Sequence, residues 1–347
     1  MVPRWLNLAS RMDQVEADIW EAPKRRLAAL FAHLGQIPAL GECRNVSISG
    51  PIHVSAHARL FLCRVPQNSE PFLAKCFFES GTERADIEEA RLQYEALVQL
   101  NETRGANNSF NLVQPFHLFG DDGVIVQSWI DGKSLDRALG DTAFSIDQLT
   151  SSVAGAGTWL GHFHRFGNDG QTGTVSGTLM DEIEGGAKGA RVLTAAVQLL
   201  RRSIVGQGKT GQPVTTIHCD YKPANVIAAK DGVCAIDFQL STRASIYFDL
   251  GHFLNSLAID LMKSRRLGVM LRARQLESAF VAGYERVAGP IDPLILAYYL
   301  VYDLSRYMVQ HGDARAGVAG RGKWWAMEHL LKLRLARFRA AERRGAA

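Results

Sequence analysis

Long apolar segments are absent from this chain of 347 residues. The longest uninterrupted apolar run, Leu294 to Val301, is less than half as long as the roughly 20 residues that cross a bilayer. Charged and polar residues also interrupt the first 14 residues, so the pattern predicts no secretory signal. We therefore expect no membrane span and a cytoplasmic location.

Cysteine is scarce, and its spacing excludes a cysteine metal centre. The five cysteines form no pair at metal-ligand spacing, and most of them lie within strand-like runs. An odd number of cysteines in such runs indicates buried, reduced thiols rather than a disulfide framework. This pattern is typical of a cytoplasmic protein.

A basic surface of the kind that binds nucleic acid is also missing. The net charge is +4, but residues 321–347 contain eight basic and two acidic residues, so the rest of the chain is slightly negative. We predict no nucleic-acid partner.

Within the basic segment 321–347, Lys323 to Arg344 reads as a basic amphipathic helix. It could lie on anionic lipid, but we favour packing of its apolar stripe against the core.

The composition that is present fits a globular protein with room for two domains. Hydrophobic residues make up 47% of the chain and charged residues 21%. Residues 1–40 have a helical pattern and are predicted to form an N-terminal helical extension. Pro23 is expected to split this extension, and Gly35 is expected to end it.

Strand patterns follow from Val46 to Phe78, with turns expected at Gly50-Pro51 and near Gln67. Lys75 lies in the last of these strands between apolar neighbours, so it must either reach out of the sheet or meet a negative group. A helix rich in Glu, Ala, Leu and Arg is predicted from Ala85 to Leu100.

The most informative stretch runs from Thr215 to Asp237. It reads as a strand, an exposed loop, a hairpin and a strand end, which brings Asp220, Asn225 and Asp237 around one opening. Three oxygen-bearing side chains suit phosphoryl transfer, which needs oxygen ligands for Mg²⁺ and a carboxylate that accepts the hydroxyl proton. Asp220 would be this base, and Asn225 and Asp237 would hold the metal. Lys222 could reach the transferring γ-phosphate.

The residues H-x-D-x-K-P-x-N, followed by I-D-F, resemble the catalytic core of the aminoglycoside phosphotransferase and choline kinase superfamily. The alternative is a hairpin in which the Asp and Asn residues serve only as turn residues. The resemblance implies an α+β, two-lobed, protein-kinase-like fold with a small antiparallel-sheet N-lobe at 41–127, a hinge at 128–133 and a larger helical C-lobe at 134–347.

The resemblance also implies a nucleotide site that uses ATP and Mg²⁺. Lys75 would pair the α- and β-phosphates, and a glutamate of the 85–100 helix would fix this lysine. Glu95 is our choice for that glutamate, with Glu89 as the rival. Backbone groups near Ser128 and Ile130 would bind adenine. Asp249 would cap a helix and brace the catalytic loop.

The predicted function is therefore ATP-dependent transfer of phosphate to a small hydroxylated molecule such as a sugar, an amino alcohol or an aminoglycoside-like acceptor. The 53 residues between His164 and His218 favour a small acceptor over a protein chain. A protein Ser/Thr kinase and a nucleotide-binding pseudokinase without turnover are the alternatives. Acidic residues such as Asp303 would suit a cationic acceptor, whereas Arg243 and Arg306 would suit a carboxylate or a sugar phosphate.

Overall fold

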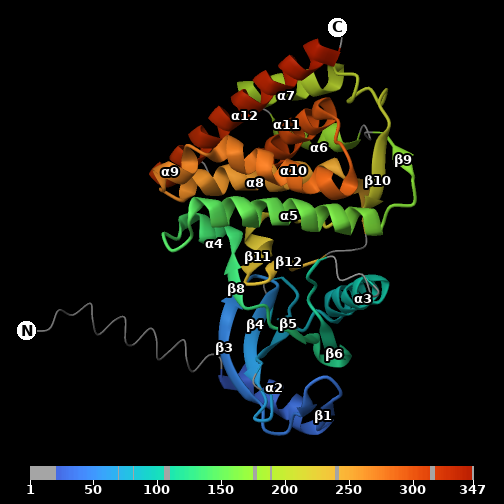
Figure 1. The fold of residues 1–347 in the computed structure, drawn as a ribbon, viewed down its shortest axis with the longest axis vertical. Coiled ribbons are helices and arrows are strands. Elements are labelled where there is room, and N and C mark those ends of the chain that lie inside the picture. The colour runs from blue at the N-terminus through green and yellow to red at the C-terminus, as the bar shows by residue number, and fades with distance from the viewer. Residues whose placement is uncertain are drawn as a thin grey trace, which may run out of the picture. The chain divides into compact units, whose positions relative to one another are not determined.

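A computed structural model describes residues 21–68, 70–80, 82–104, 110–174, 178–187, 190–238, 242–312 and 317–345. It confirms an α+β architecture of antiparallel sheets and many helices (Figure 1). The chain divides into two compact units, the first comprising Met1–Ala106 and Leu112–Ile130, the second Asn107–Asn111 and Asp131–Ala347. Residues 1–20 of the expected N-terminal extension lie outside the described residues.

The first unit is built on a five-stranded antiparallel sheet with the strand order β3-β4-β5-β7-β6. Its strands are β3 (Ser47–Val54), β4 (Ala58–Arg64), β5 (Phe72–Phe77), β6 (Pro115–Phe119) and β7 (Val124–Ser128). The other elements of this unit are α2 (Glu21–Leu34), β1 (Gln36–Ile37), β2 (Gly41–Glu42), α3 (Ile87–Arg104) and the 3₁₀ turn η1 (Gly120–Asp122).

Helix α2 begins close to Pro23 and ends as expected before Gly35. Pro23 lies in the first turn of α2, where a missing N–H removes no helical hydrogen bond. Gly35 has a φ of 74°, the left-handed conformation that glycine adopts at low cost after a helix.

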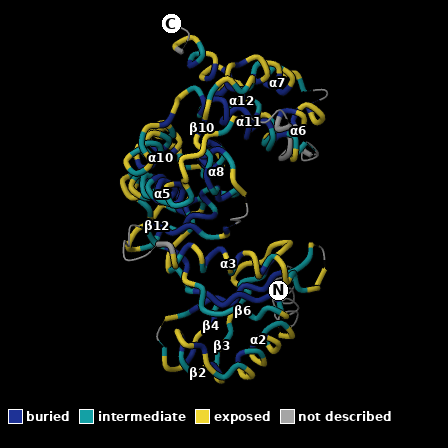
Figure 2. Tube along the Cα trace, turned by 90° about the vertical axis from the view of Figure 1, so that its right-hand side faces the viewer, coloured by how far each residue is buried: buried dark blue, intermediate teal, exposed yellow. Residues whose placement is uncertain are grey.

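The sheet is covered on both faces, and strand periodicity decides which side chain meets which helix. Phe72, Ala74 and Cys76 of β5 belong to the cluster that α2 covers with Leu27 and Phe31. The alternate residue Phe77 packs with Ala90 of α3 on the other face. Figure 2 shows buried segments of this sheet between α2 and α3, and β5 is buried along its whole length. Lys75 shares the α3 face with Phe77 because side chains alternate along a strand.

The turn expected at Gly50-Pro51 is wrong, because β3 continues through these residues to Val54. The pairing of β3 with β4 shifts register between Ser49 and His53, and Gly50 has a φ of 110°. These residues form a bulge, for which glycine is well suited. The chain instead reverses at residues 55–57, where Ser55 N–H donates to Ala58 O at 2.9 Å.

The second unit combines two small sheets with a helical layer. One sheet has the order β12-β11-β8 and the other β13-β10-β9. The strands are β8 (Gly132–Ser134), β9 (Thr172–Gly173), β10 (Gln212–Thr216), β11 (Val226–Ala229), β12 (Gly232–Ala235) and β13 (Arg243–Ser245), with the 3₁₀ turn η2 (Pro223–Asn225) before β11. The helices are α4 (Leu135–Gly140), α5 (Ile146–Phe166), α6 (Thr178–Gly186), α7 (Arg191–Arg202), α8 (Tyr247–Lys263), α9 (Leu267–Met270), α10 (Ala273–Ala288), α11 (Pro293–Gln310) and α12 (Gly317–Gly345).

Helices α5 and α10 pack backbone to backbone. A Cβ atom added at Gly157 would lie 2.0 Å from Phe280 O, and one added at Gly283 would lie 2.0 Å from Ala154 O. Glycine at these two positions permits the close approach. The paired helices form a base for β12, which packs against α5.

Helix α12 packs its apolar stripe inward, as we favoured from the sequence. Met327, Leu331, Leu335 and Phe338 are buried, and α12 contacts α11 and α7. Arg334 is also buried. Its Nε donates to Asn255 Oδ1 at 3.2 Å, and its Nη2 donates to Glu277 Oε1 at 2.8 Å. None of the described helices is long and apolar enough to cross a bilayer.

Candidate functional site

The loop that contains Asp220 connects β10 to β11 and is fixed by the buried carboxylate of Asp249. Asp249 Oδ2 accepts from His218 N–H at 2.7 Å, and Oδ1 accepts from Cys219 N–H at 3.0 Å. His164 Nε2 lies 3.0 Å from Oδ2. Burial raises the pKa of Asp249, but the hydrogen bond from His164 and the neighbouring charges lower it overall. The carboxylate therefore stays charged and anchors the loop.

Two details of this anchor are the backbone conformation of Cys219 and the position of Asp249 in α8. Cys219 has a φ of 69°, an uncommon conformation for a residue with a side chain, and its N–H bond to Asp249 supports it. Asp249 braces the loop as expected, but it is not the N-cap. Helix α8 begins at Tyr247, so Asp249 lies within its first turn.

Asp220 is surrounded by hydrogen-bond donors. Its Oδ2 accepts from Lys222 Nζ at 2.6 Å and from Asn225 Nδ2 at 2.9 Å. Its Oδ1 lies 3.3 Å from His252 Nε2. Burial raises the pKa of Asp220, but the hydrogen bonds from His252 and Lys222 outweigh burial and hold the pKa well below its usual range. Asp220 is therefore an oriented carboxylate anion.

His252 joins Asp220 to a second buried carboxylate, Asp303 of α11. The two nitrogens of its ring lie 3.3 Å from Asp220 Oδ1 and 3.0 Å from Asp303 Oδ1. Asp303 Oδ2 accepts from Asn255 Nδ2 at 3.0 Å. Burial alone would lower the pKa of His252, but Asp303 and Asp220 raise it to about 10. At neutral pH, His252 is thus an imidazolium between two carboxylates.

This charge state predicts a pH dependence of stability. The ordinary pKa of histidine is 6.5, and that of folded His252 is about 10. The stabilisation is therefore fully present below pH 6.5 and is lost as the pH rises through 10. In this window the unfolding free energy should fall by at most about 1.4 kcal/mol per pH unit.

Denaturant unfolding between pH 6.5 and 10 measures this effect, with His252→Asn as the comparison. Among the described residues, the carboxylates of Asp220 and Asp303 contact the ring, and Arg306 lines the same cavity as His252. The variant should have a flatter profile than the parent, because the other titrating groups contribute to both proteins. Parallel profiles would contradict the assigned charge of His252.

Asn225 and Asp237 are brought together by the hairpin of β11 and β12. Ile236 N–H donates to Asn225 O at 2.9 Å, and Asp237 follows directly, exposed and with a φ of 68°. The Asn225 amide donates to Asp220, so its carbonyl oxygen is directed elsewhere. One amide oxygen and one carboxylate fit Mg²⁺, which takes hard oxygen ligands and commonly completes its shell with phosphates and water. The described residues contain no group of three or more His, Cys, Asp or Glu side chains that could hold a metal alone.

In the first unit, the partner expected for Lys75 must be corrected. Lys75 Nζ donates to Gln93 Oε1 at 2.9 Å, and Gln93 Nε2 donates to Glu89 Oε1 at 2.8 Å. Glu95, our choice, is exposed and accepts from Arg91 Nη1 at 2.9 Å. The rival Glu89 is thus linked to Lys75 through Gln93. Lys75 itself is buried in β5, with Nζ 4.8 Å from the centre of the Phe77 ring.

The two residues expected near adenine end the first unit. Ser128 N–H donates to Gln114 O at 2.9 Å, and Ser128 Oγ accepts from Gln114 N–H at 2.9 Å. The N–H of Ser128 is therefore already used in a bond to Gln114, the residue before β6. Ile130 is half-buried at the end of this unit.

Sequence reasoning missed the roles of His252 and Gln93 in these networks. His252 lies one helical turn after Asp249, on the same face of a largely apolar helix. A polar residue at that position could have indicated a role beside Asp249. Gln93 lies one turn after the buried Ala90, which gives the same kind of signal for α3.

Solved structures of small-molecule kinases share this fold. A glucosamine kinase in complex with glucosamine, ADP and inorganic phosphate has a TM-score of 0.56 and 14% identity, and the match covers 83% of this chain and 81% of that one. An amicoumacin kinase in complex with AMP-PNP, Ca²⁺ and Ami has a TM-score of 0.56 and 12% identity, covering 92% and 95%.

A choline/ethanolamine kinase family protein from Mesorhizobium loti has a TM-score of 0.53 and 14% identity, covering 91% of this chain and 98% of that one. No curated protein matches the sequence. Residues 78–290, more than half of the chain, match the phosphotransferase enzyme family. The loop that contains Asp220, its Asp249 anchor and the β11–β12 hairpin all lie within this match. The chain therefore belongs to the phosphotransferase enzyme family.

Proposed function

We propose that this protein is an ATP-dependent kinase that transfers the γ-phosphate to a hydroxyl group of a small molecule. The observation that supports this most directly is the environment of Asp220. Its carboxylate is ionised and positioned by Lys222, Asn225 and His252, beside the hairpin that presents Asn225 and Asp237. The glucosamine kinase and amicoumacin kinase structures, which contain ADP and AMP-PNP, support ATP as the donor.

In the proposed reaction, Asp220 orients the acceptor hydroxyl and takes up its proton. The hydroxyl oxygen bonds to the γ-phosphorus while the bond from that phosphorus to the bridging oxygen of ADP breaks. A carboxylate with a low pKa is a weak base, but it suits a loose transition state in which the hydroxyl needs orientation more than early deprotonation. Lys222 would leave Asp220 Oδ2 to meet the charge on the transferring phosphate.

Two further groups of residues complete the proposed site. Asn225 and Asp237 would hold Mg²⁺, which neutralises phosphate charge when bound. Lys75 would pair the α- and β-phosphates, with Gln93 and Glu89 holding its ammonium group. Because Gln93 is neutral, it would position Lys75 without competing strongly with phosphate for its charge.

The proposal is tested by incubating the purified protein with ATP and Mg²⁺ and a panel of sugars, amino alcohols, hydroxy acids and aminoglycosides. We expect ADP release that depends on an acceptor, with the phosphate ester identified by mass spectrometry. Labelled phosphate on proteins but on no small molecule would favour a protein kinase. Stabilisation by nucleotide without turnover of any acceptor would favour a pseudokinase.

A further inference from the structure

A cavity of about 450 Å³ lies within the second unit next to the catalytic loop. Its lining includes Cys219, which precedes Asp220, and His252, whose Nε2 is 3.3 Å from Asp220 Oδ1. This volume is in the usual range for pockets that bind small molecules. Under the proposed function, a molecule in this cavity would be next to the base, which makes the cavity the candidate acceptor site.

The charge of the cavity lining is positive. Its ionisable side chains among the described residues, apart from the Cys219 thiol and the Tyr299 phenol, are Arg243, His252, Asp303 and Arg306. The one carboxylate, Asp303, is 4% exposed and already binds His252 and Asn255. No described lining residue therefore offers an available carboxylate to an ammonium group.

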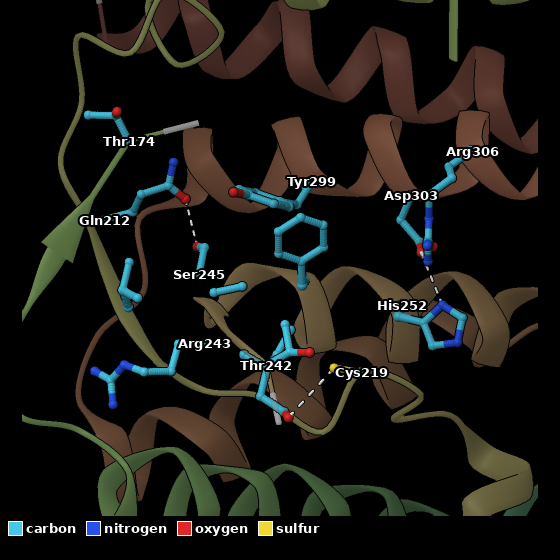
Figure 3. Close-up of a pocket in the computed structure, with 14 residues that line it drawn as sticks. Thr174, Gln212, Cys219, Thr242, Arg243, Ser245, His252, Tyr299, Asp303 and Arg306 are labelled. Atoms are coloured by element: carbon cyan, nitrogen blue, oxygen red, sulfur yellow. Dashed lines mark hydrogen bonds and ion pairs between the residues drawn. The ribbon is translucent and has the colours of Figure 1, made fainter. Parts of the chain in front are cut away.

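Arg306 is the cation whose hydrogen-bonding capacity is least used. Its Nε is buried and has no hydrogen-bond partner among the residues that the structure describes. Its nearest carboxylate oxygen, Asp303 Oδ1, is 3.7 Å from Nη2, which is longer than a hydrogen bond, and the same oxygen accepts from His252. Figure 3 shows Arg306 and Asp303 on one side of the cavity, near His252. A guanidinium with unused donors matches the two oxygens of a carboxylate or phosphate.

Arg243 differs from Arg306, because a surface ion pair already occupies it. Arg243 Nη2 is 2.8 Å from Asp169 Oδ1, and both side chains are more than two-fifths exposed. It lies across the cavity from Arg306 (Figure 3). Arg306 is therefore the better anchor for a bound anion.

The remaining walls are mostly uncharged. Phe248 and Tyr299 meet edge to face with ring centroids 4.9 Å apart. Burial raises the pKa of Tyr299 to about 12, so its hydroxyl stays neutral, and Ser245 and Gln212 lie beside it. These walls suit a compact molecule that has an apolar edge together with hydroxyl groups.

We propose that the phosphate acceptor is a hydroxylated small molecule that bears a carboxylate or phosphate group, bound by Arg306, and that ammonium-bearing acceptors are disfavoured. This inference rests on the proposed function for the position of the base. The cavity lining favours an anionic acceptor over a cationic one, two classes that the sequence left open.

The test compares molecules that share a skeleton and differ in charge. Gluconate, glucose and glucosamine form one set, and glycerate, glycerol and serinol form another, with glucose 6-phosphate as the phosphate probe. We expect turnover, or stabilisation of the folded protein, in the order anion, neutral, cation. Arg306→Gln should raise KM for anions on the order of 10- to 100-fold with a smaller effect on kcat, and Arg306→Lys should restore part of the loss.

Arg201→Gln is the matched control, because it removes one positive charge from an exposed ion pair on α7 outside the cavity lining. It should leave KM unchanged. Preferred turnover of glucosamine or serinol would overturn the acceptor class while the kinase proposal stands. Equal stabilisation of the parent and Arg306→Gln by gluconate, glycerate and glucose 6-phosphate, or stabilisation of neither, would also overturn it. Failure to bind ATP would instead count against the kinase proposal.

Discussion

Asp220→Asn is expected to lower kcat about a thousandfold, within the range known for the loss of a general acid or base. The amide cannot accept the hydroxyl proton. It also places an NH₂ group or a single carbonyl among three donors, Lys222, Asn225 and His252. Acceptor-dependent ADP release measures the loss, and nucleotide binding should persist because Asp220 is not assigned to the nucleotide.

Asp231→Asn provides the matched control for this change. Asp231 is exposed at the turn between β11 and β12, and the same atoms are replaced there without touching the loop. Its kcat should remain close to that of the parent. A parent-like kcat in Asp220→Asn would exclude Asp220 as the base, whereas equal losses in both variants would indicate a general effect on the fold.

Asp249→Ala is expected to lower the unfolding free energy by about 3–5 kcal/mol, the usual result of breaking a buried, hydrogen-bonded charge arrangement. The change removes the acceptor for the N–H groups of His218 and Cys219 and leaves His164 without its carboxylate. Because Cys219 depends on this support for its left-handed backbone, kcat should fall as well.

Denaturant unfolding of the Asp249 series separates the charge from the hydrogen bonds. Asp249→Asn keeps one acceptor oxygen and should lose less stability than the alanine variant. Asp121→Ala, at an exposed position of η1, should remain within about 0.5 kcal/mol of the parent. A loss below about 1 kcal/mol in Asp249→Ala would show that other contacts fix the loop.

The part of the site that could be predicted from sequence is the part formed by local structure. Asn225 and Asp237 belong to one hairpin, whose strand pattern and turn residues also set its pairing, and the structure pairs Asn225 with Ile236. The apolar neighbours of Lys75 likewise predicted that it lies in a strand, and the structure places it in β5. Local periodicity and turn chemistry are sufficient for such contacts.

The contacts that sequence reasoning missed depend on helix phase or on tertiary packing. The buried positions of α3 recur at helical spacing and are Ala90, Gln93, Ala96, Leu97 and Leu100. Glu95 is two residues from Gln93 and points to the opposite face. The helical spacing of the apolar residues alone could therefore have excluded Glu95 as the partner of Lys75. In contrast, Asp303 lies 51 residues after His252, and only the packing of α11 on α8 brings them together.

The buried Arg334 of α12 is linked to Asp220 through a series of polar contacts. Arg334 binds Asn255, Asn255 binds Asp303, and Asp303 binds the His252 ring that touches Asp220. A truncation ahead of position 334 would therefore remove more than part of the buried apolar face of α12. It would also leave Asn255 without its guanidinium partner and so loosen the contacts that orient the Asp220 carboxylate.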